Sequence, residues 1–322
     1  MNGFRTQLVR LQSLLALAGM VLALSVMTDT FLTVDNGMNV LRQTSVNLCL
    51  SIGMTLVILS GGIDLSVGSI LAISGAVAAG LLKDGIEVEQ FDTLIRFTVL
   101  GAIVAGTGVG LVLGAFNGLV ITRFGLPPFV ATLGMLSIAR GLTMLWTGGF
   151  PITGLGADFG YIGTGYFLGV PMPVWISAAL VALFVVVTRR TRFGRYIYAI
   201  GGNERAAVLS GLNVKRTKLL VYTLCGGLAG IAGLLVAARL DSATPGAGMT
   251  YELDSIAAVV IGGTSLSGGR GSILGTVLGC LIIGVLNNGL VLLEVSPFWQ
   301  QVIKGLVIIV AVAVDRMSRR EV

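Results

Sequence analysis

Residues 60–70 read SGGIDLSVGSI, and they interrupt an apolar stretch that runs from residue 41 to residue 82. Three glycines and an aspartate lie in this short segment, whereas the sequence on both sides is predominantly apolar. The flanking pieces 41–60 and 65–82 each have the length of a membrane helix, because a hydrocarbon core of roughly 30 Å needs about 20 residues of α-helix to cross it. The segment therefore predicts two membrane helices joined by a tight turn.

The composition extends this interpretation to the whole chain. The 322 residues are 55% hydrophobic and 11% charged, with a mean hydropathy of +0.95. Charged residues make up about 25% of a typical soluble domain, so this chain carries too little charge to cover a soluble surface. We predict an all-α, polytopic integral membrane protein in the lipid bilayer. About ten transmembrane helices are expected, at 12–28, 41–60, 65–82, 97–121, 129–146, 173–188, 219–238, 254–267, 272–292 and 299–315.

Loop charges predict the orientation of these spans. With the N-terminus inside, the interior loops hold 15 basic residues and the exterior loops four, while 11 acidic residues, Glu89 and Asp92 among them, lie outside. Cytoplasmic loops are enriched in Lys and Arg, so we expect both termini to be cytoplasmic. The span 254–267 is the weakest, because about 14 residues of helix rise only ~21 Å. We expect it to be short or broken.

The same residues limit the possible functions. The net charge of +6 follows from the basic interior loops, and no separate basic domain indicates a nucleic-acid partner. There is no histidine, no metal-ligand spacing and no evident pair of carboxylates, so we expect neither catalytic residues nor a metal site. The cysteines Cys49, Cys225 and Cys280 lie in separate apolar spans and are interpreted as core residues. A transporter is favoured over a membrane enzyme.

One segment suggests nucleotide binding but does not support it. Residues 265–272, SLSGGRGS, resemble the Leu-Ser-Gly-Gly signature of ABC ATPases. A Walker A loop needs a Gly-Lys pair whose lysine reaches the phosphates, and this pair occurs nowhere in the sequence. We interpret 262–272 as a glycine-rich helix break, so any ATP must be hydrolysed by another protein.

The longest interior loop, 188–218, contains the signals of a short helix. Asn203 is a suitable N-cap, Glu204 lies in the first turn, where the helix dipole favours a negative charge, and Gly211 suits the position after the C-cap. Such a short helix is marginal in water, so packing on neighbouring segments or on a cytoplasmic partner must hold it. A solvated basic loop would explain the arginines but not the caps.

Asp64 in the opening segment has two possible roles. An acid within the membrane costs roughly 2.5–3.5 kcal/mol on insertion scales, so Asp64 is expected at the cytoplasmic boundary or in a polar interior. Gly61, Gly62 and Gly68 permit a tight turn there. Asp64, with Ser66 beside it, either caps the helix at 65–82 or takes part in gating or substrate binding.

Four blocks of sequence together carry a family resemblance. They are TLVILSGGIDLSVGS (55–69), RFGRYIYAIGGNERAAVLSGLNV (192–214), YELDSIAAVVIGGTSLSGGRGS (251–272) and LNNGLVLL (286–293). In this order they resemble the permease subunits of bacterial ribose-type ABC sugar importers. The resemblance covers nearly the whole chain and implies one transmembrane permease domain, 1–322, with a cytoplasmic coupling loop at 189–218.

The resemblance also implies a function and partners. The chain would move a monosaccharide, ribose before others, across the bacterial inner membrane by alternating access. It would pair with a second copy of itself, a periplasmic sugar-binding protein and a cytoplasmic ATPase that binds ATP and Mg²⁺, so that the chain itself needs no cofactor and is not an enzyme. Residues that match the family's ATPase contact are those of the predicted helix: Asn203, Glu204, Ala206, Ala207 and Gly211.

A neutral sugar calls for amide and hydroxyl side chains along its path. Asn47, Asn117, Asn287 and Asn288 lie among apolar neighbours in the spans and are candidates, although hydrogen bonds between helices would account for them equally well. The alternative function is a stand-alone sugar carrier or channel driven by an ion gradient. It predicts a membrane-buried acid or histidine that binds the ion, and no such residue is evident from the sequence.

Overall fold

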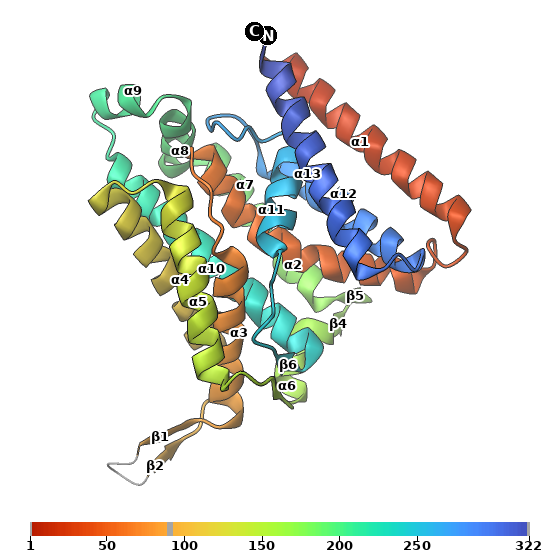
Figure 1. Cartoon of the computed structure of the whole chain (residues 1–322), viewed down its shortest axis with the longest axis vertical. Helices are drawn as coiled ribbons and strands as arrows, with labels where there is room; N and C mark the ends of the chain where they lie inside the picture. The colour runs from red at the N-terminus through yellow and green to blue at the C-terminus, as the bar shows by residue number, and fades with distance from the viewer. Residues whose placement is uncertain (1, 89–92, 321–322) are drawn as a thin grey trace. The chain divides into compact units, whose positions relative to one another are not determined.

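The computed structural model describes residues 2–88 and 93–320 and consists mainly of α-helices (Figure 1). The acids Glu89 and Asp92 lie outside the described residues. The long helices are α1 (Asn2–Met27), α2 (Val34–Leu59), α3 (Val67–Lys83), α4 (Val99–Phe124), α5 (Pro128–Thr147), α7 (Met172–Arg190), α10 (Val214–Leu240), α12 (Ile273–Leu292) and α13 (Pro297–Arg320). Shorter helices are α6 (Ala157–Thr164), α8 (Arg192–Gly202), α9 (Glu204–Leu209) and α11 (Tyr251–Ile261).

Short antiparallel strand pairs lie between the long helices. The strands β1 (Ile86–Val88) and β2 (Thr93–Ile95) form a hairpin that extends beyond the end of α3 (Figure 1). The other pairs join β3 (Ile152–Thr153) to β6 (Ser242–Ala243) and β4 (Tyr166–Phe167) to β5 (Val170–Pro171). All three pairs lie outside the predicted spans, so they do not change the all-α class.

Each predicted span falls on a helix, and the chain is an all-α, polytopic membrane protein. Within the described residues, α2, α4, α5, α7, α10 and α12 are long and apolar enough to cross a bilayer. Shorter apolar helical segments lie in α1, α3 and α13. The expectation of a short element at 254–267 agrees with α11, whose 11 residues rise only about 16 Å before the glycine-rich loop.

Local sequence signals set several helix ends. The hydroxyls of Thr33 and Thr98 accept backbone N–H bonds at the starts of α2 and α4, at 3.3 and 3.2 Å. These N-caps satisfy donors that the helix itself leaves unpaired. Gly125 ends α4 with φ 68°, and Pro128 then opens α5 at a position where its missing N–H costs nothing.

The chain divides into two compact units. Unit 1 consists of Met1–Gly61, Ser177–Leu212 and Leu253–Val322, and unit 2 consists of Gly62–Ile176 and Asn213–Glu252. In unit 2, α10 packs against α3 and α4. Glycines allow α4 and α10 to approach closely, because a Cβ on Gly114 would lie 2.9 Å from the Cα of Gly226. Alanines and Phe159, from α3, α4, α6 and α10, fill the adjacent core.

Unit 1 is held partly by polar side chains between its helices. The hydroxyls of Thr55 in α2 and Thr276 in α12 lie 2.7 Å apart, and the amides of Asn36 and Asn288 exchange two hydrogen bonds of 3.0 and 2.8 Å. Helix α1 packs against α12. The N-terminal end of α1 and the C-terminal end of α13 lie at the same end of unit 1 (Figure 1).

Candidate functional site

The predicted two-turn helix is present as α9, with the predicted caps. The side chain of Asn203 accepts a 3.0 Å hydrogen bond from the Ala206 N–H, and Glu204 occupies the first turn. Gly211 follows the C-cap with φ +80°, and its N–H bonds to the Val208 carbonyl at 3.0 Å. This left-handed conformation is one that glycine adopts without steric cost.

The C-terminal turn of α9 exposes two apolar side chains. Ala207 is buried at 3% exposure, whereas Val208 is 56% and Leu209 is 88% exposed. Glu204, Ala206 and Gly211 are also exposed. Adjacent valine and leucine side chains at the tip of a short capped helix form a small apolar contact surface, which we call the α9 tip.

Helix α8, directly before α9, was missed by the sequence analysis. Its N-cap is Thr191, whose hydroxyl accepts the Gly194 N–H at 3.2 Å, and its buried face holds Gly194, Ile197 and Ile200. The three-residue spacing of those positions was the available signal. Asn203 serves both as the C-cap of α8 and as the N-cap of α9, so no flexible linker separates the two helices.

The turn at 60–68 places Asp64 in a polar interior, which is one of the two locations expected from the sequence. Asp64 is fully buried instead of lying at a water-facing boundary. The backbone N–H and the hydroxyl of Ser66 both donate to Oδ1 of Asp64, at 2.9 and 2.5 Å, and Asn117 donates to the Ser66 hydroxyl at 2.9 Å. The N-cap residue of α3 is Ser66, so Asp64 braces the turn two residues before the helix.

Burial shifts the pKa of the Asp64 carboxyl group. Desolvation raises the pKa of Asp64 above its ordinary value, while hydrogen bonds from Ser66 and Cys225 oppose this shift. The ion-driven alternative predicts a membrane-buried acid, and Asp64 is an acid that is buried within the protein. Gly61, with φ +83°, supplies the turn that the sequence predicted, and Gly62 is buried beside it.

The candidate sugar-path asparagines are divided between the two units. Asn47, Asn287 and Asn288 belong to unit 1 and Asn117 to unit 2. Asn117 donates a hydrogen bond to Ser66, and Asn288 donates one to Asn36. These two amides therefore fit the alternative role, hydrogen bonding between helices. The Oδ1 atom of Asn287 is buried and, within the described residues, has no hydrogen-bond partner.

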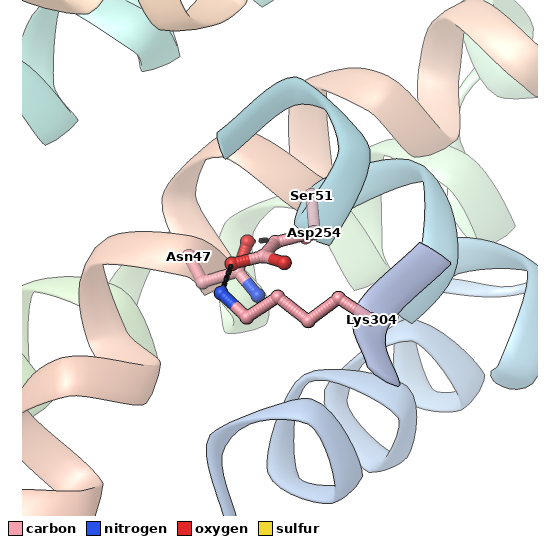
Figure 2. A network of polar contacts seen from close by, with 4 residues as sticks. All are labelled: Asn47, Ser51, Asp254 and Lys304. Atoms are coloured by element: carbon pink, nitrogen blue, oxygen red, sulfur yellow. Dashed lines mark hydrogen bonds and ion pairs between the residues drawn. The ribbon is translucent and has the colours of Figure 1, made fainter. Parts of the chain in front are cut away.

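A charged pair in unit 1 was not predicted as part of any site. Lys304 Nζ lies 3.0 Å from Asp254 Oδ2, with side-chain exposures of 21% and 10%. Figure 2 shows the pair beside Asn47 and Ser51, whose hydroxyl donates to the Asn47 Oδ1 at 3.4 Å. Asp254 is another of the 11 acids that the predicted orientation places outside. The pairing explains why both charges are tolerated within an apolar segment.

The described residues show no group of three or more His, Cys, Asp or Glu side chains that could hold a metal ion. Apolar helices of membrane length with buried amide side chains among them are consistent with a membrane transport protein. The chain belongs to the family described as "Branched-chain amino acid transport system / permease component", which matches residues 36–312. It is therefore a permease component and not an enzyme.

Individual relatives are similar over almost their full length. The ribose import permease protein RbsC of Escherichia coli (strain K12) is 49% identical over 97% of this chain and 95% of the relative. RbsC of Bacillus subtilis (strain 168) is 50% identical over 95% of this chain and 92% of the relative. The D-allose transport system permease protein AlsC of Escherichia coli (strain K12) is 41% identical over 91% and 87%. No solved structure matches the chain.

Proposed function

We propose that the chain is the transmembrane permease subunit of an ABC importer that moves a monosaccharide, ribose before others, across the bacterial inner membrane. The observation that carries this proposal is the similarity to two ribose import permeases. Each is about 50% identical to this chain over nearly its full length. The allose relative is less similar, which favours ribose over a hexose. The chain acts as one permease domain, 1–322, and translocates the sugar by alternating access.

The proposed topology has ten crossings with both termini in the cytoplasm. The excess of basic residues in alternate loops supports this orientation. The first residues of α1 and the last residues of α13 lie at the same end of unit 1, which agrees with an even number of crossings (Figure 1). Helix α11 is too short to span alone, so its crossing is completed by the glycine-rich loop, which is allowed where protein surrounds the backbone.

Three partners complete the proposed importer. A second copy of the chain forms the other half of the pathway, a periplasmic sugar-binding protein delivers the substrate, and a cytoplasmic ATPase binds ATP and Mg²⁺. This chain itself carries no cofactor. The α9 tip fits a groove of the ATPase, because it is apolar, exposed and firmly capped. Asn203, Glu204, Ala206, Ala207 and Gly211 are the proposed coupling residues.

The sugar path is proposed to include some of the predicted asparagines. The buried Oδ1 of Asn287 has no hydrogen-bond partner in the described part of the chain, and Asn47 lies in the polar network of Figure 2, so both amides can bind sugar hydroxyls. The amides of Asn117 and Asn288 already bond to other helices. They contribute to the path only if those bonds open during transport.

The buried acid gives the alternative function specific support. A carrier driven by a proton or sodium gradient needs a buried carboxylate that changes its charge, and Asp64 is fully buried with a raised pKa. Asp254 is a weaker candidate, because Lys304 already neutralises it. Asp64 is also explained by its bonds to Ser66, which fix the turn before α3.

Reconstitution into proteoliposomes distinguishes the two functions. Uptake of labelled ribose is measured with the chain alone, with the binding protein and ATPase added singly, and with both. The importer predicts uptake only with ATP and both partners, and a panel of sugars then ranks ribose, allose and galactose. Gradient-driven uptake by the chain alone would contradict the proposal.

A further inference from the structure

The C-terminal end of α8 makes close backbone contacts with two other segments of unit 1. A Cβ on Gly201 would collide with the Leu59 carbonyl oxygen at the end of α2 and would lie 2.5 Å from the Gly269 nitrogen. A Cβ on Gly268 would lie 2.9 Å from the Gly201 Cα and 3.1 Å from the Gly61 Cα. We call this meeting of Leu59–Gly61, Gly201 and 268–269 the glycine junction.

In addition to close packing, hydrogen bonds hold the segments of the glycine junction together. The Gly269 N–H donates to the Leu59 carbonyl at 3.0 Å, and this carbonyl would otherwise be unpaired at the end of α2. The Tyr198 hydroxyl of α8 donates to the Gly271 carbonyl at 2.9 Å. Burial raises the pKa of Tyr198, although Arg189 opposes the shift, so the hydroxyl keeps its proton at neutral pH.

The loop between α11 and α12 is itself well braced. The Ser265 N–H bonds to the Arg270 carbonyl and the Gly268 N–H to the Ser265 carbonyl, both at 2.9 Å. Gly268 and Gly269 have φ values of +84° and +70°, which favour glycine. We expect a loop held in this way to move as one piece if α8 is displaced.

The elements that meet at the junction lead from α9 towards the polar network. Helix α9 starts directly after the Asn203 cap that ends α8. Helix α2 carries Asn47 and Ser51, and α11 carries Asp254 (Figure 2). A displacement of α9 would therefore reach these helices through the close backbone contacts and the Tyr198–Gly271 bond.

We propose that the glycine junction transmits movement of α9 to α2 and to the α11–α12 loop, and that Gly201, Gly268 and Gly269 are positioning residues for energy coupling. This inference rests on the proposed importer function. It assigns a role to the glycine-rich segment 262–272. An added side chain at the junction would separate α8 from α2 without touching the α9 tip.

Two adjacent glycines give a matched test. Gly201 and Gly202 both lie in the last turn of α8, but a Cβ on Gly202 would meet nothing within 4 Å. The complete importer carrying Gly201→Ala or Gly202→Ala is reconstituted with its ATPase and binding protein, and sugar uptake per ATP hydrolysed is measured. Gly201→Ala should lower this ratio about tenfold with ATPase assembly retained, a change within the size of known coupling effects. Gly202→Ala should stay within about twofold of wild type.

Equal ratios for the two variants would overturn the inference. If Gly201→Ala fails to insert, Tyr198→Phe decides, with Tyr196→Phe on the same helix as its control. Loss of the bond to Gly271 should lower the ratio about threefold, and an unchanged ratio would overturn the inference. Absence of ATP-dependent uptake in the wild type would instead contradict the proposed function.

Discussion

The helix interfaces of unit 2 and unit 1 show different ways of packing helices in a membrane. In unit 2, α4 and α10 meet backbone to backbone at Gly110, Gly114 and Gly226. In unit 1, α2 and α12 are joined by Thr55–Thr276 and Asn36–Asn288 bonds, and α11 and α13 by Asp254–Lys304. Lipid tails are as apolar as the helices, so association depends on close packing or on polar bonds, and each interface emphasises one of these.

The difference bears on which contacts can change during transport. Glycine contacts lose their packing as soon as the helices separate, so α4 and α10 are suited to move as one body. Polar side chains can exchange partners, with each other, with water or with a sugar hydroxyl. The polar interfaces of unit 1 are therefore better suited to change during a transport cycle.

The largest effect is expected at the charged pair. Lys304→Met leaves the Asp254 carboxylate buried without its cation, which should destabilise the protein by about 3 kcal/mol. The double variant Lys304→Met with Asp254→Asn removes both charges at similar volume and should recover most of the loss. Thermal unfolding in detergent measures both variants. Equal destabilisation of the single and double variants would show that the unpaired Asp254 charge does not cause the loss of stability.

The glycine interface should respond next. A Cβ on Gly226 would collide with the Gly110 carbonyl oxygen and lie 2.7 Å from the Gly114 Cα, so Gly226→Ala must force α4 and α10 apart. We expect a loss of about 1–3 kcal/mol. Gly108→Ala in α4 is the control, since its Cβ would meet nothing within 4 Å. The comparison fails if both variants unfold at the same temperature.

A smaller effect is expected from the cap of α9. Asn203→Ala removes the acceptor for the Ala206 N–H, which should cost about 1 kcal/mol of local helix stability. Uptake by the assembled importer should then fall about fivefold, because that free energy corresponds to a fivefold change. Asn203→Asp keeps an acceptor and should transport normally. An importer that tolerates the alanine equally well would show that the cap is not needed.

The smallest effect is expected at Asp64. In Asp64→Asn the amide oxygen can still accept the Ser66 N–H, so uptake should stay within about twofold of wild type. The folded-state pKa of Asp64 is raised, so wild-type stability should fall as pH rises from the ordinary value of about 3.9 through the folded-state pKa. The Asn variant should lack this fall. Abolished uptake with normal insertion would instead indicate a gating or ion-binding role.

Local sequence signals predicted much of the fold. Apolar length located each long helix, and the Asn203, Glu204 and Gly211 caps predicted α9 in detail, because these signals depend on neighbours within a few residues. Helix α8 was missed because its three-residue pattern is interrupted by arginines and tyrosines at the edge of a basic loop.

Contacts between distant residues could not be predicted in the same way. Asn288 bonds to Asn36, 252 positions away, and Lys304 to Asp254, 50 positions away, and no local pattern indicates such partners. The same limit left two locations open for Asp64, the boundary and a polar interior, since its burial depends on how α3, α4 and α10 pack. The glycines of 262–272 predicted a helix break but not the α8 backbone that lies against them.

The central claim is that energy enters this permease from the cytoplasm through α9, and cysteine labelling tests it most directly. Cys49, Cys225 and Cys280 are buried, so a Glu204→Cys variant offers one exposed thiol among the described residues. A membrane-impermeant maleimide should label it in inside-out vesicles but not in intact spheroplasts, and the bound ATPase should protect it. Labelling in spheroplasts would contradict the account.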